Sequence, residues 1–134
     1  MPEQLEKTAL TQTSNVTLTT TSETVIISSG RVPVPTQTCL VLIRAWAQLT
    51  NGTGTTAVTP RIRRGTTTSG TLVSEANAET IKTAAAGTEP YTMMATEQRS
   101  NEESVEYSFT LQQTGASADG TALQAAIEVE ILSG

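Results

Sequence analysis

The chain has 134 residues, carries a net charge of −5 and contains no histidine. This length suits one domain, and the absence of imidazole removes the commonest general base and metal ligand near neutral pH. The acidic balance, with a pI of about 4.6, disfavours nucleic acid and anionic membrane surfaces as partners, because both attract basic proteins. About one residue in five is threonine, which favours strands over helices. We expect an all-β protein without enzymatic activity.

Residues 1–13 are mostly polar, and Leu5 and Leu10 are their only large apolar side chains apart from Met1. We expect this segment to be a short N-terminal arm, followed by one domain over residues 14–134. The segment lacks the basic start and the apolar stretch of a signal peptide, and the chain contains no apolar run of the roughly 18 residues that a transmembrane helix needs. The sequence therefore predicts a protein that is made in the cytoplasm without a signal peptide.

Apolar and polar side chains alternate from residue 14 onward, which is the pattern of strands with one buried face. The first candidate strands cover residues 15–19 and 23–28. The segment 31–35 carries two prolines two residues apart, and proline cannot donate a ladder hydrogen bond. This segment is therefore predicted to lie at an edge of a sheet.

The strongest strand is predicted for residues 38–49. Its odd-numbered residues form an apolar core face over the whole length: Cys39, Val41, Ile43, Ala45, Ala47 and Leu49. The dipeptide Asn51-Gly52 follows it and predicts a hairpin, from which the chain returns in a strand over residues 57–64.

The second half of the chain continues the alternation. A short strand, a loop, a second short strand and a charged connector are predicted over residues 71–74, 75–88, 89–96 and 97–104. Two strongly alternating strands, 105–113 and 121–132, follow and flank a turn that predicts a second hairpin. About eight strands separated by turns are typical of sandwiches, jelly rolls and closed barrels. We predict a single all-β domain, an antiparallel β-sandwich or jelly roll.

No residue pattern in the sequence indicates a catalytic, metal or cofactor site. Cys39 lies on the apolar face of a strand, where a cysteine behaves as a small buried hydrophobic residue. Glu128 and Glu130 project from the outer face of the last strand, and a glycosidase cleft would also need more aromatic side chains than one Trp, two Tyr and one Phe. We therefore predict no enzymatic activity, no cofactor and no metal ion.

Arg61, Arg63 and Arg64 form the one basic cluster of the sequence. Two interpretations remain open: a patch for an acidic partner, or cross-strand pairing with glutamates of the same sheet, such as Glu106, Glu128 or Glu130. We keep the three arginines as candidate partner contacts.

The even-numbered residues of the strand 38–49 include Leu40, Leu42, Arg44 and Trp46. They lie opposite the core face, so a monomer would expose the two leucines, whereas a symmetric oligomer would bury them. Trp46 then lies at a subunit contact or on a ligand surface, or it fills a gap at the edge of the sandwich. We take these four residues as the candidate subunit interface.

The segments RIRRGTTTSGTLVSEA, EPYT and VEYSFTLQQTGASADGTALQAAIEVEIL resemble β-sandwich proteins of tailed-bacteriophage virions, such as capsid decoration (cement) proteins and head-fibre jelly rolls. The resemblance covers residues 14–134 and implies a homotrimer that binds the major capsid protein lattice at the capsid surface. It also implies an arm that reaches the capsid, with Leu5 and Leu10 as candidate contacts. The alternative is a carbohydrate- or receptor-binding module of a phage tail or fibre.

Overall fold

The computed structural model describes residues 4–12, 16–18, 22–34, 37–51, 56–77, 79–81, 89–100, 104–113 and 120–133. In these ranges the chain consists of strands and their connections. A helix long and apolar enough to span a membrane is not found in them.

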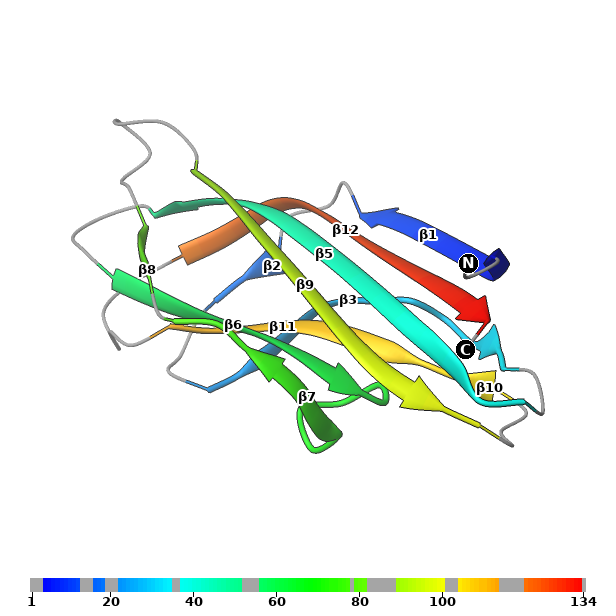
Figure 1. Ribbon diagram of the computed structural model, residues 1–134. Coiled ribbons are helices and arrows are strands. Elements are labelled where there is room, and N and C mark those ends of the chain that lie inside the picture. The colour runs from blue at the N-terminus through cyan, green and yellow to red at the C-terminus, as the bar shows by residue number, and fades with distance from the viewer. Residues whose placement is uncertain are drawn as a thin grey trace.

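Two antiparallel sheets pack face to face (Figure 1). The first sheet has the order β1 (Gln4–Gln12), β12 (Gly120–Ser133), β5 (Cys39–Asn51) and β9 (Glu89–Arg99), with β2 (Val16–Thr17) beside β12. The second sheet has the order β3 (Thr24–Ser28), β11 (Tyr107–Gln113), β6 (Thr56–Arg64) and β7 (Thr71–Glu75), with β8 (Glu79–Ile81) beside β6. A short separate ladder joins β4 (Val32–Pro33) to β10 (Ser104–Val105).

The longer strands are distributed over the two sheets in the order of a jelly roll. The short strands β2, β4, β8 and β10 are left out of this count, so eight strands remain. Numbered one to eight along the chain, they form one sheet in the order 1-8-3-6 and the other in the order 2-7-4-5. Two Greek keys wound together give this arrangement. The predicted all-β sandwich or jelly roll is therefore confirmed, and the short β4 places one proline of the segment 31–35 in a minor edge ladder.

The two predicted hairpins are wrong. β5 pairs with β12 and β9, whereas β6 pairs with β11, β7 and β8 in the opposite sheet. The chain likewise changes sheet between β11 and β12 (Figure 1). A strand with one apolar face is buried by the opposite sheet whichever strand lies beside it, as β5 and β12 show. A turn signal between two such strands therefore does not decide which strands pair.

The segment expected to be an N-terminal arm contributes β1 to the first sheet. Its ladder with β12 runs from Gln12 opposite Ala125 to Gln4 opposite Leu132. Backbone hydrogen bonds hold a strand at an edge whatever its side chains, so a polar segment serves to cover the edge of the long, apolar β12. This placement differs from the expectation of an arm outside the domain.

Two further boundaries differ from the sequence analysis. β9 continues to Arg99, so the first part of the expected charged connector 97–104 is strand. The expected loop 75–88 contains β8, which pairs with β6, while residues 78 and 82–88 lie outside the described part of the chain.

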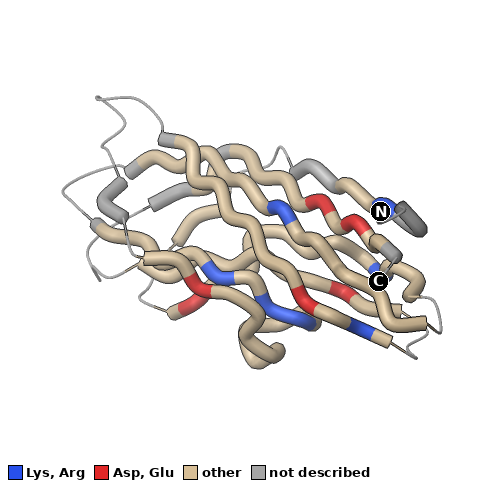
Figure 2. Tube along the Cα trace, viewed as in Figure 1, with Lys and Arg blue, Asp and Glu red and all other residues tan. Residues whose placement is uncertain are grey.

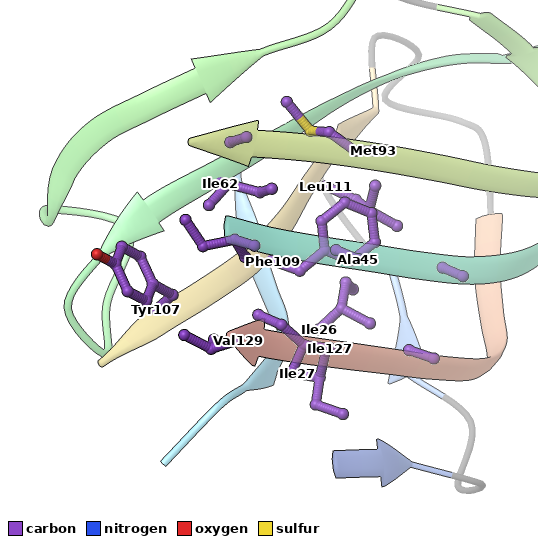
Figure 3. Packing of buried hydrophobic residues seen from close by; sticks show 14 of the residues in the cluster. Ile26, Ile27, Ala45, Ile62, Met93, Tyr107, Phe109, Leu111, Ile127 and Val129 are labelled. Carbon is purple, nitrogen blue, oxygen red and sulfur yellow. The ribbon is translucent and has the colours of Figure 1, made fainter. Parts of the chain in front are cut away.

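The core lies between the two sheets (Figure 3). All six odd-numbered residues of β5 from Cys39 to Leu49 are buried, as the alternation predicts. They pack with Ile127 and Val129 of β12 and with Phe109 of β11 in one cluster. Burial of this continuous apolar layer is the main favourable term in folding.

A tight turn between β6 and β7 depends on Gly70. A Cβ atom at this position would lie 2.4 Å from the carbonyl oxygen of Arg64, and the carbonyl of Gly70 accepts a hydrogen bond of 2.9 Å from Nη1 of Arg63. We expect Gly70→Ala to lower the free energy of unfolding by roughly 1–3 kcal/mol, because the backbone must move to admit the methyl group. Urea denaturation measures this. The exposed neighbour provides the control, since Ser69→Ala should change stability by less than about 0.5 kcal/mol.

Candidate functional site

The outer face of the first sheet carries the candidate site. The strand registers place Ala9 of β1, Glu128 of β12, Arg44 of β5 and Met94 of β9 in one row across the sheet. A pocket of about 490 Å³ lies over this row and over the next one. Its volume falls within the range of roughly 300–1,000 Å³ that is usual for small-ligand sites.

Trp46 lies in the second row of the pocket. Its neighbours in register are Ala126 on β12 and Thr92 on β9, and all three line the pocket. Trp46 is half-buried, because two small side chains flank the indole and neither covers it fully. The alternation of β5 directs the ring outward while Ala45 and Ala47 face the core.

Trp46 is the one aromatic side chain of this chain that reaches the surface. The sequence has one Trp, two Tyr and one Phe, and Tyr91, Tyr107 and Phe109 are all buried. A ring that filled a gap at the edge of the sandwich would be covered, whereas Trp46 is only half-buried. Both a subunit contact and a ligand surface need such an exposed ring, so its role stays a prediction.

Three ion-paired side chains, Lys7, Glu128 and Arg44, lie at the polar side of the pocket. Nη1 of Arg44 donates to Oε1 of Glu128 at 2.6 Å, and Nζ of Lys7 lies 3.5 Å from Oε2 of the same carboxylate. The side chains of Lys7 and Arg44 are about half exposed, so these ion pairs contribute less than about 1 kcal/mol each to stability. Their effect is to orient the carboxylate and the guanidinium at the rim of the pocket.

The outer face of the second sheet carries a second charged cluster, centred on Glu23; Figure 2 shows basic and acidic residues side by side on both sheets. Arg63 binds this carboxylate through Nε at 2.6 Å and Nη2 at 2.8 Å. Arg61 donates to it at 3.1 Å, and the hydroxyl of Thr110 donates at 2.6 Å. Arg61 also contacts Glu75 at 3.3 Å. Only 15% and 17% of the side chains of Arg61 and Arg63 remain exposed.

Arg64 joins the two sheets. Its Nε donates to Oε1 of Glu97 on β9 at 2.9 Å, and the hydroxyl of Tyr107 donates to the same oxygen at 2.9 Å. Burial, together with the nearby negative charge of Glu97, raises the pKa of Tyr107. The hydrogen bond to Glu97 raises the pKa of Arg64 more than burial lowers it.

The basic cluster thus pairs with glutamates, as one of the two sequence interpretations holds, but the expected partners were wrong. The carboxylates are Glu23, Glu75 and Glu97, and Glu128 pairs with Arg44 and Lys7 on the other sheet. For Glu128 and Glu130 the reason is the topology, because β6 and β12 belong to different sheets.

The candidate interface residues separate into two groups. Arg44 and Trp46 line the pocket, whereas Leu40 and Leu42 lie farther along β5 and are half-buried. The exposed large hydrophobic residues in the described ranges are Leu72, at 45%, and Met94, at 63%. Leu5 and Leu10 belong to β1 by their backbone, and their side chains lie outside the described part of the structure.

Sequence reasoning missed Ala126 and Thr92 as neighbours of Trp46, and Glu128 and Met94 as neighbours of Arg44. The alternation places Ala126 and Glu128 on the outward face of the last strand, but it does not reveal which strands lie beside β5. That information is in the pairing of β5 with β12 and β9, which skips β6.

The described residues offer little catalytic chemistry. The thiol of Cys39 is buried and donates to the carbonyl of Arg99 at 3.4 Å, and burial raises its pKa, which disfavours the nucleophilic thiolate. Groups of three or more potential metal-ligating side chains do not occur within the described ranges.

No protein-family model matches the chain, and no curated protein matches it. Among solved structures, the chain is similar to the CBM22-1 xylan-binding domain from Paenibacillus barcinonensis Xyn10C. The TM-score is 0.40 and the sequence identity is 10%, over 98% of this chain and 96% of that domain. A likeness of this size carries no functional argument.

The Glu23 cluster predicts acid sensitivity. Burial by itself raises the pKa of Glu23, but hydrogen bonds from Arg63 and Thr110 and the charges of Arg63 and Arg61 outweigh it and lower the pKa below its ordinary value of 4.5. The stabilisation is therefore complete above pH 4.5 and is lost as the pH falls through the lower pKa of the folded state.

We expect Glu23→Gln to lower the free energy of unfolding at pH 7 by about 2 kcal/mol. The variant should also lose less stability than the parent protein on acidification below pH 4.5. Denaturant titrations across this pH range measure both effects, with Glu106→Gln as a carboxylate change outside the cluster. An unchanged acid dependence in the Glu23 variant would contradict the assignment.

Proposed function

We propose that this protein is a non-catalytic carbohydrate-binding β-sandwich module, and that its pocket on the first sheet holds one sugar unit against Trp46. The observation that carries the proposal is that the one aromatic side chain at the surface, Trp46, lines a pocket. Of the two functions that the sequence left open, this is the alternative.

The pocket has the two chemical surfaces that a sugar ring needs. One face of a pyranose consists of C–H groups, which pack on the flat apolar indole of Trp46. The edge of the ring carries hydroxyl groups, each of which donates and accepts hydrogen bonds. The Glu128 carboxylate accepts such bonds, and the Arg44 guanidinium has five N–H donors, of which Glu128 takes one at 2.6 Å.

The charges around the pocket favour a neutral sugar. On the described outer face of the first sheet, the positive charges of Lys7 and Arg44 are matched by the negative charges of Glu128 and Glu130. An anionic sugar would have to compete with Glu128 for Arg44. A neutral sugar leaves the ion pair in place and binds to its remaining donors and acceptors.

Removal of the indole tests the proposal. We expect Trp46→Ala to weaken the binding of neutral oligosaccharides, identified on a glycan array, by at least about tenfold in Kd, which corresponds to 1.4 kcal/mol. Trp46→Phe retains a ring and should keep part of the affinity. Calorimetry measures binding, and thermal unfolding confirms that both variants fold. Full affinity in a folded Trp46→Ala variant would overturn the proposal.

The two cations bound to Glu128 form a matched pair for a second test. Arg44 lines the pocket, whereas Lys7 contacts Glu128 outside the pocket lining. Arg44→Met removes the donors and keeps an apolar stem, so we expect a loss of about fivefold in affinity for the same oligosaccharide, or roughly 1 kcal/mol for a hydrogen bond. Lys7→Met should change the affinity by less than twofold. Equal losses in both variants would show that Arg44 acts by neutralising the charge of Glu128, as Lys7 does, and not by direct contact with the sugar.

A second candidate function is capsid decoration, in which a homotrimer binds the capsid lattice through this face. It is supported by the presence of Trp46 and Arg44 on one open face, since Trp and Arg dominate the energetics of protein–protein contacts. Co-sedimentation with undecorated capsids, in the absence of any glycan binding, would favour this candidate over the carbohydrate-binding module.

A further inference from the structure

We infer that the outer edge of β9 is an interface for a second copy of this chain, in which the two β9 strands pair antiparallel about a two-fold axis at Met94. β9 is the last strand of the first sheet and pairs with β5 on one side (Figure 1). Among the described strands, none forms a ladder with residues 92–98 on the other side of β9.

β9 lacks the features by which proteins protect sheet edges from pairing. These features are short length, bulges, prolines and central charges, lysine above all. β9 is 11 residues long, and its ladder with β5 has no register shift from Leu49 opposite Glu89 to Cys39 opposite Arg99. Its one proline, Pro90, is next to its start, and residues 91–96 carry no charge. The one charge between Glu89 and Arg99 is Glu97, which pairs with Arg64 of β6.

The other strands that end the two four-stranded orders, β1, β3 and β7, show such features. β1 has a register shift between Gln4 and Glu6 in its ladder with β12 and carries Lys7 in the strand. β3 and β7 are five residues long, and both of their ladders contain a register shift. β9 is therefore the edge best suited to accept another strand.

The sequence of β9 is complementary to itself in one antiparallel register. Pairing Met94 with Met94 of the second copy places Glu89 opposite Arg99 at both ends of the ladder. A parallel arrangement would instead place Glu89 beside Glu89 and Arg99 beside Arg99, and like charges directly opposite each other destabilise a sheet.

Burial of Met94 adds an apolar contact at the centre. Met94 has the larger exposed fraction of the two exposed large hydrophobic residues in the described ranges, at 63%. At a two-fold axis the two Met94 side chains would lie on the same face of the joined sheet and cover each other. Such an isologous contact closes at two copies, so this edge favours a dimer, whereas the homotrimer expected from the phage resemblance remains a separate prediction.

The dimer would place both pockets on one face of a continuous sheet. Three strand spacings separate the two β5 strands, or roughly 14 Å, so the two Trp46 pockets would face the same surface and bind a polymer with higher avidity than one pocket alone. This consequence rests on the proposed function, but the strand pairing does not.

Charge exchange at residue 94 tests the pairing without reference to any ligand. We expect sedimentation of the parent protein to give a mass near 28 kDa, twice the 14.1 kDa of the chain. Met94→Lys and Met94→Glu should each sediment as monomers, since like charges would meet at the axis. An equimolar mixture of the two variants should recover the dimer, because lysine then meets glutamate. Leu72→Lys, the same change at the other exposed hydrophobic residue, should leave the dimer intact.

A parent protein that sediments as a monomer or as a trimer near 42 kDa would overturn the inference. A dimer that persists in both Met94 variants would overturn it as well. Because mass is measured without a glycan, failure of the pairing is distinguishable from failure of carbohydrate binding, which would leave the sedimentation results unchanged.

Discussion

The strict two-residue alternation of β5 is the constraint on which the rest of the structure depends. Every odd-numbered residue from Cys39 to Leu49 is buried in the core, so every even-numbered residue must face outward. Because β5 lies between β12 and β9, its outward face is the middle of a sheet and not an edge. Core and pocket are therefore opposite faces of one strand, and a shift of register by one residue would exchange them.

The pocket arises from a size difference within that outward face. Trp46 is flanked by Ala126 and Thr92, while the adjacent row carries Arg44, Glu128 and Met94. Small residues beside a large ring leave the ring accessible, and longer side chains one row away form the rim. The outward face of the second sheet is covered by charged side chains. Glu23, Arg61 and Arg63 form ion pairs over it, and Ser108 and Thr110 of β11 are fully buried. The first sheet instead leaves Trp46 and Arg44 accessible in its pocket.

The sequence predicted the parts of the fold that depend on alternation, such as the core face of β5. It did not predict which strands are neighbours, because Asn51-Gly52 suits a hairpin locally, whereas a strand with one apolar face is buried by the opposite sheet whichever strand lies beside it. The strand β1 was missed because its side chains carry no apolar pattern and its backbone provides the pairing. Alternation also showed that Trp46 and Arg44 face outward. It could not identify their neighbours on β12 and β9, because alternation does not reveal which strands pair.

The most direct measurement is the fluorescence of Trp46 during titration with neutral oligosaccharides. The chain has one Trp, so its emission reports on this pocket alone. A sugar stacked on the indole removes water from the ring, and we predict a saturable blue shift whose midpoint agrees with the Kd from calorimetry. An oligosaccharide that binds by calorimetry yet leaves the emission unchanged would place the binding site elsewhere and contradict this account.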